Sequence, residues 1–301
     1  MRGKTAAIVF GMAINAALLS ICPAQAGWFG GSDTPAPAAD DGLVNQIQQA
    51  LDDQRYVDAS SLLDRALISG NSNPKLTLLA GELNLAKGRY DFALASFKRI
   101  DAEPTLRARA LEGEGVGLSL LGRTDEALPV LETAVSLNPS SWHAWNTLGV
   151  IYDRRHEWLK AGDAYDHAMA TSGVSPLVLN NRGFSRLSQN RPDDAAADFV
   201  AALQKKPDFS SARNNLRLAM AMKGDYARAT EGASATDRPS ILNNAGFAAM
   251  ARGDYSAAES LLGQAMQAKG EYYSVAAANL EVVRGLESGG ASGTVPNAAA
   301  P

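Results

Sequence analysis

The sequence is poor in the residues that carry most metal and redox chemistry. Its 301 residues include one cysteine, Cys22, and three histidines, His143, His156 and His167. No second cysteine and no His-Glu-x-x-His spacing accompanies them, so neither a disulfide framework nor a zinc site is predicted. We therefore expect no metal ion and no cofactor, and stability has to come from the packing of side chains.

Sequence motifs for nucleotide binding and for hydrolysis are also missing. Gly113, Gly115 and Gly117 alternate without the Lys-Ser or Lys-Thr pair of a phosphate-binding loop, and Gly-x-Ser-x-Gly does not occur. Paired acids such as Asp193 and Asp194 stand at expected turns, where they favour the positive end of the next helix. We predict no catalytic residue and no enzyme activity.

Long apolar runs are absent except at the start of the chain. Arg2 and Lys4 precede an apolar run that ends at Ile21, and residues 24–26 form the small-x-small pattern of signal peptidase cleavage. We interpret residues 1–26 as a removable export signal, which places the protein in the periplasm. Loss of Arg2 and Lys4 makes a chain of net charge −4 more acidic, and this disfavours nucleic acid as a partner.

Two fates of Cys22 remain open at this point. Cleavage after Ala26 would remove the only thiol, whereas a lipobox ending in Cys22 would leave a lipid anchor and attach the protein to a membrane, such as the outer membrane. Ile21 is bulky where a lipobox has a small residue, and Pro23 follows the cysteine. Contact with a membrane is expected only in the lipidated case.

A repeat of 34 residues runs through most of the chain. Aromatic residues often stand three positions before a recurring alanine, a glycine often stands twelve before it, and a larger side chain usually follows four after it. Arg217 and Ile47 break the glycine column, and Ala233 breaks the column of larger side chains. The recurring alanines are Ala59, Ala93, Ala127, Ala161, Ala195 and Ala229, with Ala258 only 29 residues after the sixth.

One repeat resembles the tetratricopeptide repeat family in most of its signature positions. These positions are Trp145, Leu148, Gly149, Tyr152, Ala161, Tyr165 and Ala168. The resemblance implies an all-α fold, a right-handed tetratricopeptide-repeat superhelix of about seven helix pairs plus a capping helix over residues 271–286. We expect Gly149 and Ala161 to face each other where the two helices of this repeat cross.

The repeats divide the chain into four segments. We predict the export signal over residues 1–26, a disordered linker over 27–41, the repeat solenoid over 42–287 and a disordered tail over 288–301. The linker and the tail are rich in Gly, Ala and Pro and lack the apolar residues of a core.

Asparagine recurs in the first helices of the later repeats, although it is a poor residue for a helix interior. In the family these helices line the concave face, so the amides could bind the backbone of a partner segment; alternatively they hydrogen-bond neighbouring repeats. Apolar residues share the stripe, so an apolar or amphipathic segment is the expected ligand. The predicted partner-binding groove consists of Asn146, Asn180, Asn181, Phe184, Asn214, Asn215, Leu218, Asn243, Asn244 and Phe247.

Three stretches resemble a particular branch of the family. Residues 179–184, 212–216 and 223–226 are similar to the TadD proteins of the tight-adherence (Flp) pilus assembly system. The resemblance implies a non-enzymatic scaffold or pilotin that binds a secretin or a pilus component. TadD proteins are typically lipoproteins, so the imperfect lipobox at Cys22 is a departure. The alternatives are a generic periplasmic scaffold or chaperone for another envelope system, such as polysaccharide export, and the regulatory module of an enzyme.

Overall fold

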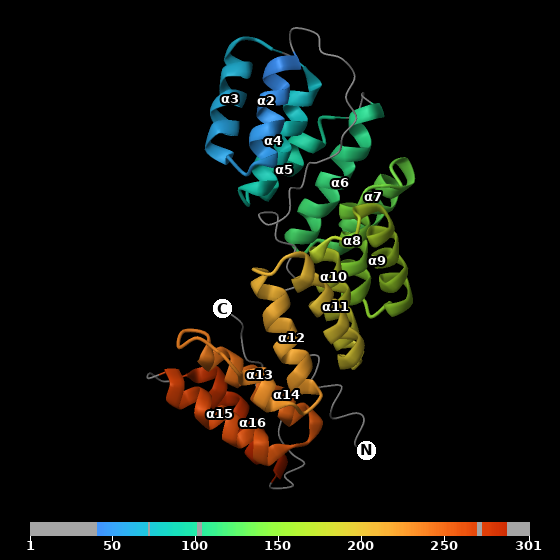
Figure 1. Ribbon diagram of the computed structural model, residues 1–301. Helices are drawn as coiled ribbons and strands as arrows, with labels where there is room; N and C mark the ends of the chain where they lie inside the picture. The colour runs from blue at the N-terminus through green and yellow to red at the C-terminus, as the bar shows by residue number, and fades with distance from the viewer. Residues whose placement is uncertain (1–40, 72, 101–103, 270–272, 288–301) are drawn as a thin grey trace. The chain divides into compact units, whose positions relative to one another are not determined.

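The computed structural model describes residues 41–287 apart from 72, 101–103 and 270–272, and in these residues it is all-helical (Figure 1). Fifteen helices and no strand occur there, which confirms the all-α class. The predicted export signal, almost all of the linker and the tail lie outside the described residues. None of the described helices combines the length and the apolar character of a membrane span.

Fourteen of these helices form the seven predicted pairs. The first helices of the pairs are α2 (Asp41–Asp52), α4 (Pro74–Ala86), α6 (Pro104–Leu120), α8 (Trp142–Arg154), α10 (Pro176–Ser188), α12 (Ser210–Met222) and α14 (Arg238–Arg252). The second helices are α3 (Tyr56–Ile68), α5 (Tyr90–Phe97), α7 (Thr124–Leu137), α9 (Trp158–Ser172), α11 (Pro192–Lys205), α13 (Tyr226–Thr230) and α15 (Tyr255–Lys269). The predicted capping helix is α16 (Ser274–Glu287).

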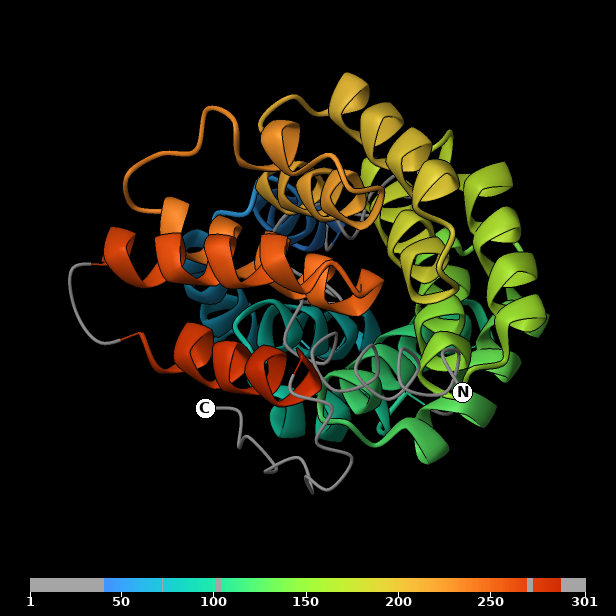
Figure 2. The same cartoon turned by 90° about the horizontal axis from the view of Figure 1, so that it is seen from below.

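The described helices belong to two compact units, residues 41–178 and residues 179–287, with the boundary inside α10. In each unit a first helix packs on its own second helix and on the first helix of the next repeat, as α6 does with α7 and α8, and α14 with α15 and α16. Figure 2 shows α15 and α16, in orange and red, lying side by side. The last pair is therefore covered by α16, as a solenoid end requires.

The turn inside each pair needs a residue in the left-handed conformation. Four predicted turn glycines, Gly88, Gly122, Gly224 and Gly253, have φ between 72° and 91°. Glycine adopts this conformation without a steric penalty, which explains its use after the first helix. In three other pairs the same place is taken by Gln54, His156 and Asn190, with φ of 58° to 59°.

The alanine column is buried, and the glycine column accommodates a large side chain of the second helix. Each of the seven alanines exposes 1% or less of its surface. A Cβ on Gly149 would lie 2.6 Å from the ring of Tyr165, and a Cβ on Gly183 would lie 2.7 Å from the ring of Phe199. The side chain nearest to Gly149 is therefore the ring of Tyr165, four residues after Ala161.

The sixth pair departs from the others. Its second helix, α13, has five residues, whereas α9 and α15 have 15 each. The chain turns into extended backbone at Glu231, and Gly232 adopts a left-handed φ of 61°. The shorter spacing between Ala229 and Ala258 is therefore explained by the loss of helical turns from α13.

Candidate functional site

Part of the predicted asparagine ladder links neighbouring repeats. Asn215 of α12 donates a hydrogen bond from Nδ2 to Oδ1 of Asn180 in α10, over 3.0 Å. Asn279 of α16 donates in the same way to Asn243 of α14, also over 3.0 Å. The first bond joins two first helices and the second joins α14 to the capping helix, so they satisfy the buried amides of Asn180 and Asn243 and link neighbouring helices of the second unit. The hydrogen bonds between repeats that the sequence left as an alternative are present for these pairs.

The ten predicted groove residues differ widely in their exposure. Six are buried, namely Asn146, Asn180, Asn181, Phe184, Asn215 and Asn243. Leu218 and Phe247 are partly exposed, while Asn214 and Asn244 are exposed. A partner that leaves the helices in place can touch only these last four, so the accessible part of the predicted groove lies on α12 and α14.

Three of the accessible residues surround one small hollow. Asn214 and Leu218 of α12 and Asn244 of α14 line it, together with Ser240 and Ile241. Its volume of about 30 Å³ admits a group the size of a water molecule. A partner segment would therefore lie across its rim, where the two amides can donate and accept hydrogen bonds. We call the surface formed by Asn214, Leu218, Asn244 and Phe247 around this hollow the α12–α14 face.

A polar chain centred on the buried Glu82 links the first helices α2, α4 and α6 of the first unit, and sequence reasoning did not identify it. Glu82 of α4 is 2% exposed and accepts a hydrogen bond from Arg109 Nη2 of α6 over 2.9 Å. The same nitrogen donates to Oε1 of Gln48 in α2 over 2.6 Å. Burial raises the pKa of Glu82 to about 7, although the charge of Arg109 acts to lower it.

Glu112 of α6 makes a second set of polar contacts, with the next repeat. It stands 34 residues before Asn146, in the asparagine column, and that register was the signal from which it could have been found. It accepts a hydrogen bond from Ser141 Oγ over 2.6 Å, and Nδ1 of His143 lies 3.3 Å from its Oε1. Burial acts to raise the pKa of Glu112, but His143 and Ser141 outweigh burial and hold that pKa below its usual value.

The histidines are spread over separate local environments. His143 lies beside Glu112, His156 occupies the turn after α8, and the ring of His167 stacks on Trp145 with centroids 4.4 Å apart. Across the described residues, no three His, Cys, Asp or Glu side chains gather into a group that could hold a metal ion.

A family model described as tetratricopeptide repeat matches residues 44–106, 121–173 and 181–238, which together exceed half of the chain. The chain belongs to the tetratricopeptide repeat family. Proteins built from stacked helix pairs of this kind offer extended surfaces for binding other proteins. This tetratricopeptide repeat protein is accordingly a protein-binding scaffold.

Two curated relatives illustrate how widely the repeat is used. The chain is 30% identical to the type IV pilus assembly protein PilF of Pseudomonas aeruginosa over 119 residues, which are 39% of this chain and 47% of PilF. It is 29% identical to the human protein O-mannosyl-transferase TMTC1 over 154 residues, which are 50% of this chain and 17% of the human protein. The chain thus spans less than half of either relative.

Solved structures of tetratricopeptide repeat proteins share the fold. A thermophilic protein of Thermus thermophilus matches with a TM-score of 0.53 and 23% identity, covering 60% of this chain and 99% of its own. A protein of Parabacteroides merdae matches with a TM-score of 0.52 and 18% identity, covering 81% of this chain and 98% of its own. At these identities the likeness concerns the fold alone.

Proposed function

We propose that this protein is a non-enzymatic scaffold of the pilotin type that assists assembly of an envelope secretion or Flp pilus machine. The observation that carries the proposal is the 30% identity to PilF, a protein named for type IV pilus assembly. The resemblance of residues 179–184, 212–216 and 223–226 to TadD proteins points to the same kind of machine. The bound partner is a secretin or another pilus component, captured through an apolar or amphipathic segment.

The proposed binding surface is the α12–α14 face. Asn214 and Asn244 present exposed amides there, and Leu218 and Phe247 add partly exposed apolar surface. An amide both donates and accepts, so this pair can bind the backbone of a segment with little regard to its side chains. The apolar residues add contact area, which favours an apolar or amphipathic ligand.

The proposed location is the periplasm. It depends on the interpretation of residues 1–26 as an export signal, which lies outside the described residues. Cleavage after Ala26 gives a scaffold without a lipid anchor, whereas lipidation of Cys22 gives one held at the outer membrane. Mass spectrometry of the mature N-terminus distinguishes the two.

The test is affinity capture from an envelope extract with the mature chain as bait. We expect the wild-type chain to retain a secretin or pilus subunit and the variant with Asn214→Ala and Asn244→Ala to lose it. Asn45→Ala is the matched control, because Asn45 is an exposed asparagine at the position of Asn244 in the first repeat.

Each result has a distinct meaning. Recovery of the subunit by wild type and control, but not by the double variant, supports both the function and its surface. Equal recovery by all three forms moves the binding site away from the α12–α14 face. Recovery of unrelated envelope proteins alone contradicts the pilus proposal and leaves a generic periplasmic scaffold.

A further inference from the structure

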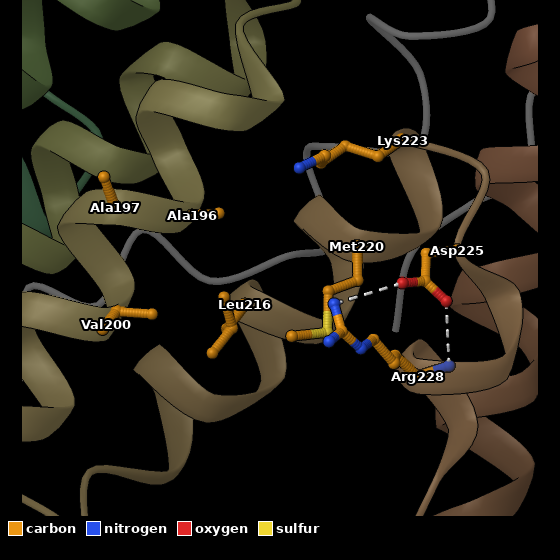
Figure 3. A pocket seen from close by; sticks show the side chains of 8 residues that line it. All are labelled: Ala196, Ala197, Val200, Leu216, Met220, Lys223, Asp225 and Arg228. Atoms are coloured by element: carbon orange, nitrogen blue, oxygen red, sulfur yellow. Dashed lines mark hydrogen bonds and ion pairs between the residues drawn. The ribbon is translucent and has the colours of Figure 1, made fainter.

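A second surface feature of the second unit is an apolar pocket between α11, α12 and α13 (Figure 3). Ala196, Ala197 and Val200 of α11 form one wall, and Leu216 and Met220 of α12 form the floor. The pocket has a volume of about 320 Å³, at the lower end of the roughly 300 to 1,000 Å³ of small-molecule sites. Val200 is 42% exposed, so apolar surface remains in contact with solvent there.

The pocket arises because α13 ends early. One repeat before, the places of Leu216 and Met220 are taken by Arg182 and Arg186, and both arginines pair with Asp198 of α11 at 2.7 Å. The residue 34 positions after Asp198 is Gly232, which lies beyond the end of α13. α13 therefore contributes no side chain at the position equivalent to Asp198 that could cover Leu216 and Met220.

The pocket and the α12–α14 face lie on opposite sides of α12. At 100° per residue, Leu216 and Met220 point about 200° away from Asn214 and Leu218. The two hollows accordingly share no lining residue. A ligand in the pocket leaves the α12–α14 face open, so the two surfaces can be tested separately.

The lining favours a helix over an extended segment. The wall and floor consist of side chains of α-helices, whose interior backbone groups already hydrogen-bond within each helix. An extended segment pressed against this apolar surface would leave its own N–H and C=O groups without partners, which is costly. A helix satisfies its backbone internally and can place one apolar stripe in the pocket.

The charges at the edge favour an acidic flank on that helix. Two cations, Lys223 and Arg228, and one acid, Asp225, line the pocket. Asp225 already caps α13 by accepting from the backbone N–H of Arg228, and Lys223 pairs with Asp193. Arg228 is 71% exposed and lies 3.6 Å from Asp225, longer than the roughly 2.7 to 2.9 Å of a strong ionic hydrogen bond. Its guanidinium can therefore receive an incoming carboxylate.

We propose that this pocket docks an amphipathic helix of a partner protein. Apolar side chains of that helix enter between α11 and α12, and a carboxylate beside them pairs with Arg228. The docked helix covers apolar surface that the shortened α13 leaves exposed. A helix of the partner thus packs where the longer second helices of other repeats would.

A defined peptide tests the proposal. The probe is a 15-residue amphipathic peptide, the length of α15, with leucines at helical spacings of three and four and glutamate elsewhere. The control peptide carries lysine in place of glutamate. Titration of the mature chain by fluorescence anisotropy measures both affinities, and we expect the glutamate peptide to bind the more tightly.

Two variants and two matched controls locate the site. Val200→Glu and Arg228→Glu should each weaken binding of the glutamate peptide about tenfold or more. Val275→Glu and Arg284→Glu on α16 alter side chains of similar exposure, 52% and 66%, and should leave binding unchanged. The variant with Asn214→Ala and Asn244→Ala should bind the peptide as wild type does, whatever becomes of the pilus partner.

Three results would overturn the proposal. The first is no binding of the glutamate peptide, or equal binding of both peptides. The second is an equal loss for Val200→Glu and Val275→Glu. The third is self-association of the chain in sedimentation velocity that Val200→Glu abolishes, because this would assign the pocket to a second copy. Circular dichroism of each variant excludes loss of the fold as the cause.

Discussion

Arg217 donates a hydrogen bond from Nη1 to the backbone oxygen of Ala229, over 2.9 Å. The same nitrogen lies 2.7 Å from the backbone oxygen of Glu231. Arg217 stands where five other repeats have glycine, and the larger side chain that would need this glycine is replaced by Ala233. Because Ala233 is small, it leaves room for the longer side chain of Arg217. That side chain donates hydrogen bonds to carbonyl groups that the end of α13 leaves without helical partners.

We expect Arg217→Gly to destabilise the protein, although it restores the residue that the repeat usually has. The variant leaves the carbonyl groups of Ala229 and Glu231 uncapped and empties the space beside them. Asn214→Gly is the matched control for the cost of glycine within α12, because Asn214 is exposed. Urea denaturation should show a loss in the free energy of unfolding about 1 to 3 kcal/mol larger for Arg217→Gly. Equal losses would mean that the hydrogen bonds of Arg217 contribute nothing to stability.

The bond between Asn180 and Asn215 should appear as an energetic coupling. Asn180→Ala and Asn215→Ala each leave a buried amide partner unsatisfied, so each should lower the free energy of unfolding. The double variant should lose less than the sum of the two, with a coupling of about 0.5 to 1.5 kcal/mol. Asn214→Ala, at an exposed neighbour, should change stability by less than about 0.5 kcal/mol. Additive losses would contradict a direct contribution of this bond.

The sequence was sufficient to predict the residues that the backbone geometry of the repeat requires. The buried alanines and the left-handed glycines at Gly88, Gly122, Gly224 and Gly253 follow from a spacing that one sequence displays directly. A residue such as Asn180 or Asn214 is different, because its exposure depends on side chains of the neighbouring repeats. Asn180 and Asn214 occupy the same position in adjacent repeats, yet Asn180 is buried and bonded to Asn215 whereas Asn214 is exposed.

The pocket on α11 and the chain of Glu82 and Arg109 could not be read from the repeat pattern. Both depend on which side chains meet across different repeats. The signal for the pocket was present in the shortened spacing after Ala229 and in Ala233, but only the structure shows which side of α12 is uncovered. Glu82 carries no motif, and its burial results from the packing of α4 against α2 and α6.

Substitution by alanine should have opposite effects on stability at Gly183, which contacts Phe199, and at Gly162, which has open space beside it. Gly183→Ala would place Cβ 2.7 Å from the ring of Phe199, whereas Cβ on Gly162 in α9 would meet nothing within 4 Å. Thermal denaturation should show Gly183→Ala destabilised, by about 1 to 3 kcal/mol. Gly162→Ala should be stabilised by about 0.5 to 1 kcal/mol, because alanine is the better helix former. Combining Gly183→Ala with Phe199→Leu should recover part of the loss, and no recovery would place the strain elsewhere.

Glu82 should make the stability of the protein depend on pH in the opposite sense from an ordinary paired carboxylate. Burial raises its pKa from 4.5 to about 7 in the folded chain, so between these values the folded state binds more protons than the unfolded state. The contribution of Glu82 is complete below pH 4.5 and is lost as the pH rises through about 7. We expect the free energy of unfolding of wild type, relative to Glu82→Gln, to fall by roughly 1 to 3 kcal/mol between about pH 5 and pH 8.

The matched control for this titration is Glu126→Gln. Glu126 is exposed and hydrogen-bonded to Arg123, which holds the pKa of Glu126 below its usual value, so this residue titrates outside the window. Urea denaturation of the three proteins at each pH makes the comparison, in which contributions common to all three cancel. Parallel curves for wild type and Glu82→Gln would show that Arg109 keeps Glu82 ionised through neutral pH. Glu82 and Arg109 would then form a fixed ionic link between α4 and α6, and Glu82 would not take up a proton on folding.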